Sequence, residues 1–164
     1  MAVVEVVVES EEWDNRPALE ARLSEAAEAA VAAADVDTLP NGEIAILLTD
    51  DEGVAALNAR WRGRDGPTNV LSWPATAPAL LPLSPMIGDI ALAYETCARE
   101  AEAEGKRFED HVTHLVVHGA LHLLGFDHDT EAGAEAMEAM ERAVLARLGV
   151  ADPYAGGDHG GNEA

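Results

Sequence analysis

The chain has 164 residues, a length typical of one domain, and 48% of them are hydrophobic, which is enough to form a buried core. Its 10 basic and 31 acidic residues give a net charge of −21, which taken alone argues against a nucleic-acid substrate, because phosphate affinity comes largely from Lys and Arg. The one cysteine, Cys97, excludes an intrachain disulfide. No run approaches the ~20 apolar residues of a membrane span, and the N-terminal run lacks the basic region of a signal peptide. We therefore expect a cytoplasmic protein without a membrane partner.

In chain order, strand patterns dominate the first part of the sequence and helical patterns the last part. Val-rich or alternating segments predict strands at residues 2–9, 43–49, 68–73 and 88–93. Capping residues and apolar periodicity predict a helix that starts at Asp14 or Asn15, has Pro17 in its first turn and runs to about residue 34, and further helices at residues 50–61, 95–105, 108–124 and 130–147. Residues 75–86 carry three prolines without a period and are expected to form a loop.

This order of elements indicates an α+β fold with a small, mixed sheet of about four strands. We expect a single domain over residues 1–151, followed by a disordered, acidic, Gly-rich tail over residues 152–164. The helix at 108–124 is apolar on several sides, so it should lie centrally and turn its histidine stripe toward a cleft.

Residues 118–128, which read HGALHLLGFDH, carry the strongest chemical signal in the chain. Residues i and i+4 share one face of a helix, so His118 and His122 can direct their rings at one point. Gly125 can adopt a left-handed conformation and end the helix, which lets His128 approach the same point from outside. Three imidazoles with a fourth position open are the ligand set of a catalytic zinc site rather than a structural one.

The spacing matches long zinc-protease motifs, so the arrangement is expected to be zincin-like. Those proteases place a glutamate, the general base, directly after the first histidine. Here that position is Gly119, which cannot move a proton. The sequence therefore predicts a metal-dependent hydrolase that is not an ordinary peptidase.

Several neighbouring residues have two possible roles. His114 and His118 would also make an i, i+4 pair, but only His118 and His122 are followed by the glycine turn and a third histidine. For His111 and His114 we expect packing or hydrogen bonding, and for Cys97 a buried structural thiol. Asp127 could orient a ligand or cap the turn after the helix.

The same residues resemble a known family. Residues 118–128 are similar to the signature H-G-x-L-H-L-x-G-[FY]-D-H of the YbeY-type metal-dependent endoribonucleases. Residues 57–74, which read LNARWRGRDGPTNVLSWP, resemble another motif of that family, with Trp73 in place of the commoner phenylalanine. Gly88-Asp89-Ile90 and the closing helix, with Glu138 and Glu141, agree as well. The resemblance runs from about residue 47 to residue 149.

The resemblance implies one zinc ion per chain, held by His118, His122 and His128, and a catalytic arginine at Arg62. It implies single-stranded RNA as substrate, in ribosomal RNA processing and ribosome quality control, with the small ribosomal subunit and its assembly factors as partners and without DNA. A guanidinium is a natural partner for the charge that develops on a phosphodiester. Arg62 could instead form a surface salt bridge to Asp65, and roles for Arg60 and Arg64 stay open.

Two other functions remain possible at this point. The motif spacing also fits a metalloprotease-like amide hydrolase, although Gly119 weakens that interpretation. The chain could also be a non-catalytic ribosome-assembly factor in which the metal is structural.

Overall fold

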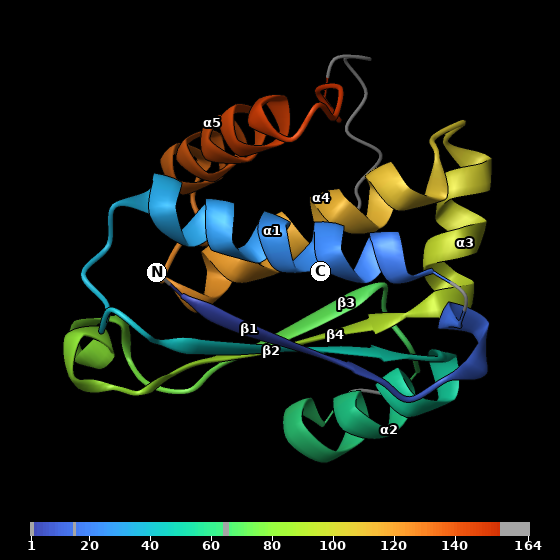
Figure 1. Cartoon of the computed structure of the whole chain (residues 1–164), viewed down its shortest axis with the longest axis horizontal. Helices are drawn as coiled ribbons and strands as arrows, with labels where there is room; N and C mark the ends of the chain where they lie inside the picture. The colour runs from blue at the N-terminus through green and yellow to red at the C-terminus, as the bar shows by residue number, and fades with distance from the viewer. Residues whose placement is uncertain (1, 15, 64–65, 155–164) are drawn as a thin grey trace.

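The computed structural model describes residues 2–14, 16–63 and 66–154, and a four-stranded sheet forms its middle layer. The strand order is β1 (Val3–Val8), β2 (Glu43–Thr49), β4 (Met86–Ala93) and β3 (Val70–Pro74). β1, β2 and β4 are parallel, whereas β3 runs antiparallel to β4 and forms an edge of the sheet (Figure 1). The predicted α+β class with a small mixed sheet is confirmed, and the likeness to zincins stays a prediction.

Helices cover the two faces of the sheet unequally. α1 (Pro17–Ala34), α4 (Phe108–Leu123) and α5 (Glu131–Arg147) lie on one side, and α3 (Tyr94–Ala103) stands at one end (Figure 1). Only α2 (Asp51–Arg62) lies on the opposite side in the described part of the chain. α4 packs against α1, α3, α5, β3 and β4, so it is the central helix of the thicker layer.

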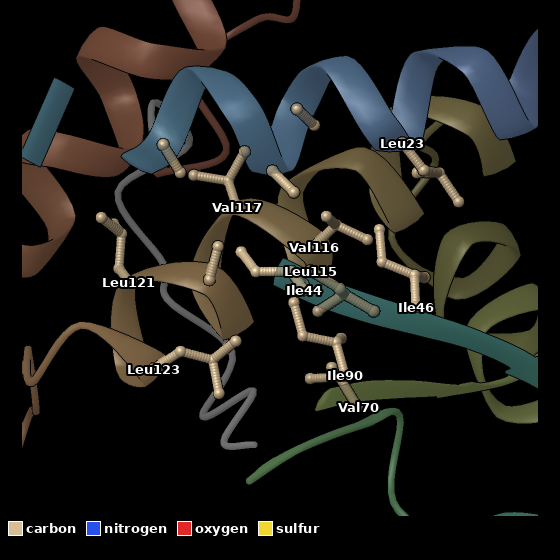
Figure 2. Packing of buried hydrophobic residues seen from close by; sticks show 14 of the residues in the cluster. Leu23, Ile44, Ile46, Val70, Ile90, Leu115, Val116, Val117, Leu121 and Leu123 are labelled. Atoms are coloured by element: carbon tan, nitrogen blue, oxygen red, sulfur yellow. The ribbon is translucent and has the colours of Figure 1, made fainter. Parts of the chain in front are cut away.

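The core explains why α4 is held rigidly. Eleven of its 16 residues are buried, as the apolar residues on several of its sides predict. Val116 and Leu121 of α4 belong to the same buried cluster as Leu23 of α1, Ile46 of β2 and Ile90 of β4 (Figure 2). Burial of each aliphatic side chain of this size stabilises the folded state by roughly 1.5–3 kcal/mol. The side chains on the remaining stripe of α4 therefore project from a fixed support.

Residues 75–86 differ from the expected loop. They contain a 3₁₀ helix, η2 (Pro78–Leu83), and β4 already begins at Met86. The tighter three-residue turn buries Leu81 completely, and its sequence has neither the period of an α-helix nor that of a strand. A second 3₁₀ helix, η1 (Glu11–Trp13), was also not expected, and it buries Trp13, whose Nε1 donates to the Thr49 carbonyl at 2.7 Å.

The end of the chain is described as far as Tyr154, and residues 155–164 of the expected tail lie outside the described residues. The first residues of that tail pack on α5 instead of leaving the surface. Oδ2 of Asp152 forms an ion pair with Nε of Arg142 at 3.3 Å. The division into a domain over residues 1–151 and a disordered tail stays a prediction. In the described part of the chain, no helix is long and apolar enough to cross a lipid bilayer.

Candidate metal centre

The three histidines of the motif come together at the C-terminal end of α4. The helix ends at Leu123, the Gly125 amide donates to the His122 carbonyl at 3.0 Å, and Gly125 has a φ of +102°. This reversal brings the ring of His128 to those of His118 and His122, with one ligand atom of each within 4.8 Å of the others. The predicted convergence of the rings is therefore confirmed.

The unused ring nitrogens fit a metal ion. Nε2 of His118 and Nε2 of His122 are buried, and neither has a hydrogen-bond partner among the described residues. Buried nitrogen atoms normally have a hydrogen-bond partner. Two such atoms that face a third imidazole therefore indicate a ligand from outside the chain. Imidazole nitrogen is a preferred ligand of zinc and of other divalent transition metals. The donor set therefore fits one such ion.

The protonation state of His122 suits metal binding as well. Burial, together with the neighbouring rings of His118 and His128, lowers the pKa of His122 to about 4, although a hydrogen bond to the backbone of Phe126 acts in the opposite direction. The imidazole is therefore neutral near pH 7. A metal ligand must be neutral because the ion and the proton compete for the same lone pair.

Glu141 of α5 holds the far side of His118. Its side chain is 1% exposed, and Oε2 accepts a hydrogen bond from Nδ1 of His118 at 3.0 Å. Oε1 accepts a second bond from Nε2 of His114 at 2.6 Å. Burial raises the pKa of Glu141, but the bonds from His114 and His118 outweigh it and hold that pKa well below its usual range. A hydrogen on Nδ1 leaves the Nε2 lone pair of His118 directed at the other two rings.

Sequence reasoning missed this role of Glu141, although a signal existed. Glu141 lies four residues after Met137 and three or four before Val144 and Leu145, all of which are buried. A glutamate in the apolar stripe of a helix is rarely buried without a partner. The partner itself could not be named, because His114 and His118 lie 27 and 23 residues away in sequence.

The other two histidines of α4 do not join the triad. Nε2 of His111 lies 2.9 Å from Oε1 of Glu100, and His114 is paired with Glu141 as described. The prediction of packing or hydrogen bonding for these two histidines is confirmed, since both are buried and each bonds a carboxylate. Cys97 is buried, as expected, and burial raises the pKa of its thiol, so it stays protonated.

Gly119 has a packing reason in this fold. A Cβ atom at this position would lie 3.3 Å from Cγ2 of Ile90, which is tighter than most real contacts. The position faces β4, so any side chain here would require Ile90 to shift by a few tenths of an ångström. Asp127 caps the turn, since its Oδ1 accepts from the Asp129 amide at 3.2 Å.

Arg62 lies beside the triad, in a hollow between α2 and β3. α2 ends at Arg62, followed by Gly63 at a φ of +63°. The hollow has a volume of about 270 Å³, and its lining residues are Arg62, Val70, Ser72, Trp73, Pro74 and His122. Among the described residues, no carboxylate forms an ion pair with the Arg62 guanidinium, and Asp65 lies outside them.

The remaining arginines of the cluster are less informative. The guanidinium of Arg60 lies 5.2 Å from the ring centroid of Trp61, which is 61% exposed. Arg64 lies outside the described residues. Arg62 is therefore the described arginine of this cluster that shares a cavity with a histidine of the triad.

A central helix with two imidazoles, joined by a third from the turn that follows it, on an α+β scaffold, is the arrangement of a metal-dependent hydrolase. Comparison with known proteins identifies which one. The family model described as Endoribonuclease YbeY matches residues 7–149. The chain belongs to the YbeY family of endoribonucleases.

Relatives agree with this assignment, and a solved structure agrees with the fold. The chain is 54% identical over 157 residues to Endoribonuclease YbeY of Rhodopseudomonas palustris (strain BisA53), covering 94% of this chain and 91% of the relative. It is 51% identical over 157 residues to Endoribonuclease YbeY of Nitrobacter winogradskyi, covering 93% and 82%. The solution structure of TM1509 from Thermotoga maritima covers 99% of this chain and all of its own, with a TM-score of 0.55 at 19% identity, and supports the fold alone.

Proposed function

We propose that this chain is a zinc-dependent endoribonuclease that cleaves single-stranded RNA during the maturation and quality control of ribosomal RNA. Its partners in this proposal are the small ribosomal subunit and its assembly factors, and it acts in the cytoplasm, where ribosomes are assembled. Membership of the YbeY family supports the reaction class. The single observation that carries the proposal is the convergence of three imidazoles, two of which have a buried Nε2 without a partner among the described residues, with Arg62 lining the same hollow as His122.

In this proposal, His118, His122 and His128 hold one zinc ion. A bound zinc ion lowers the pKa of a coordinated water to about 7 and so supplies a nucleophile near neutral pH. The chain then needs no carboxylate at position 119, where Gly119 packs closely against Ile90. Glu141 keeps the hydrogen on Nδ1 of His118, which leaves Nε2 available as a ligand.

Arg62 binds the phosphate at the cleaved bond. A guanidinium presents paired N–H donors that match two phosphoryl oxygens, and it stays charged throughout the reaction. Negative charge grows on these oxygens in the transition state, so a donor fixed beside them lowers the barrier. The position of Arg62 at the end of a helix, in the same hollow as His122, supports this role.

The net charge of −21 does not oppose RNA at this place. None of the residues that line the hollow is acidic, and Arg60 and Arg62 both lie in the last turn of α2. The field at a site depends on its own nearby charges more than on the sum over the molecule. The acidic excess should instead disfavour long nucleic acids that extend over the surface.

The test compares wild type and His122→Ala for bound metal and for cleavage of a labelled single-stranded RNA. Matched duplex RNA, single-stranded DNA and casein serve as competing substrates. We expect wild type to carry about one zinc per chain and to cut only the single-stranded RNA, and His122→Ala to do neither. Casein cleavage would indicate an amide hydrolase, and zinc without any cleavage would indicate an assembly factor.

A further inference from the structure

We propose that Glu141 and Tyr154 act as a positioning pair that orients His118, so that the segment after α5 becomes part of the metal centre. The inference rests on the proposed metal site. Tyr154 lies beyond residues 7–149, the part of the chain that the family model matches. Its hydroxyl donates to Oε1 of Glu141 at 2.7 Å.

The acceptor chemistry of Glu141 determines the tautomer of His118. An ionised carboxylate can only accept hydrogen bonds, so each of its partners must contribute a hydrogen. Three partners surround it: Nδ1 of His118, Nε2 of His114 and the hydroxyl of Tyr154. The hydrogen of His118 therefore sits on Nδ1, on the side away from the triad. Its Nε2 carries the lone pair that faces His122 and His128.

Tyr154 closes this arrangement from the C-terminal side. Its ring meets the ring of His114 edge-on, at 5.7 Å between centroids and 85° between planes. The guanidinium of Arg142 lies 5.2 Å from the Tyr154 ring centroid and also pairs with Asp152 at 3.3 Å. The Tyr154 amide donates to Asp152 at 2.8 Å, so the backbone of the segment is held as well as its side chain. These contacts fix the hydroxyl on Glu141.

A purely structural role would leave metal binding unchanged, whereas a positioning role would not. Groups that hydrogen-bond a histidine ligand typically contribute about 10- to 100-fold to metal affinity. Glu141→Gln keeps the size of the side chain but supplies one acceptor oxygen and two N–H donors, so it cannot accept on both sides. Tyr154→Phe removes one oxygen atom from a half-buried position and leaves the packing of the ring.

The experiment measures Co²⁺ binding to the metal-free full-length chain, by competition with a chromogenic chelator and by the absorption spectrum of the cobalt form. We expect the dissociation constant to rise about 10- to 100-fold for Glu141→Gln and about 3- to 10-fold for Tyr154→Phe, with an altered spectrum in both. Tyr154→Phe should add nothing further in the Glu141→Gln background, because it acts through that residue.

Two matched variants serve as controls. Glu135→Gln changes an exposed carboxylate of the same helix, and Tyr94→Phe removes a hydroxyl that accepts from Arg16 instead. Both should bind Co²⁺ as wild type does. Wild-type affinity and spectrum in Tyr154→Phe and Glu141→Gln, with only a lower melting temperature, would overturn the positioning role. Failure of wild type itself to bind the ion would instead overturn the metal site on which the inference rests.

Discussion

The two halves of α4 carry the same residue type at similar spacing, yet they do different things. In the first half, His111 and His114 each bond a carboxylate, from Glu100 of α3 and Glu141 of α5. In the second half, Nε2 of His118 and of His122 meet no protein group among the described residues. What distinguishes a ligand from a packed histidine is therefore the partner that the surrounding elements bring to its ring.

His118 lies at the boundary between these halves. Its Nδ1 bonds Glu141 as the packed histidines bond their carboxylates, while its Nε2 faces His122 and His128. The helix ends after His122, and the turn at Gly125 brings the imidazole of His128 to the site, whereas a carboxylate faces each histidine of the first half. One ring thus links the buried hydrogen-bond network to the proposed site.

The largest effect is expected from replacing a histidine in the second half of α4. His122→Ala removes one of three convergent nitrogens, so zinc content should fall from about one ion per chain to near zero, and RNA cleavage should fall at least about 10³-fold with it. Elemental analysis and a cleavage assay measure the two. Full zinc in His122→Ala, with loss in His114→Ala, would place the ligands in the first half of the helix instead.

The next effect separates metal binding from charge stabilisation. Arg62→Ala should keep its zinc and its melting temperature but lose about 10²- to 10³-fold in cleavage rate at saturating RNA, the scale of one lost transition-state donor. Arg62→Lys should recover only part, because an ammonium cannot make the paired contact. Arg60→Ala is the control and should weaken RNA binding slightly and in a salt-dependent way. Equal rates for Arg62→Ala and wild type would remove the arginine from catalysis.

A smaller effect is expected from the first half of the helix. His111→Ala leaves a cavity and removes a buried partner of Glu100, so it should cost about 1–3 kcal/mol. The melting temperature should fall by roughly 2–4 °C per kcal/mol, with zinc content unchanged. Scanning calorimetry and elemental analysis on one sample decide the point. Zinc loss in this variant would contradict the division of α4 into two halves.

The smallest effect is a pH dependence of the metal-free protein. Burial first, and then the neighbouring rings of His118 and His128, lower the pKa of His122 from 6.5 to about 4, so below pH 6.5 the unfolded chain binds a proton that the folded chain does not. His122 therefore destabilises the fold progressively as the pH falls from 6.5 toward 4. His122→Gln has no imidazole at this position and therefore lacks this pH-dependent destabilisation. The melting temperature of wild type minus that of His122→Gln should decrease over this window, and a constant difference would contradict the shift.

Much of the site was predictable because its geometry is local. The helical period and one glycine turn act within residues 118–128, so the convergence of His118, His122 and His128 follows from spacing alone. The α+β class was predictable for a similar reason, since the order of strand and helix patterns restricts how layers can form. The burial of α4 followed from apolar residues on several of its sides.

The tertiary structure alone decided which groups surround those histidines. Glu100 reaches His111 from another helix, and Glu141 reaches His118 across 23 residues of sequence. Tyr154 joins them from a segment whose Gly-rich, acidic composition indicated disorder. Such contacts depend on how whole elements pack, and packing is set by the complementary shape and burial of many side chains at once. No local pattern encodes it, so the sequence by itself determined the three converging rings, and the fold determined which ring nitrogens were left for a metal.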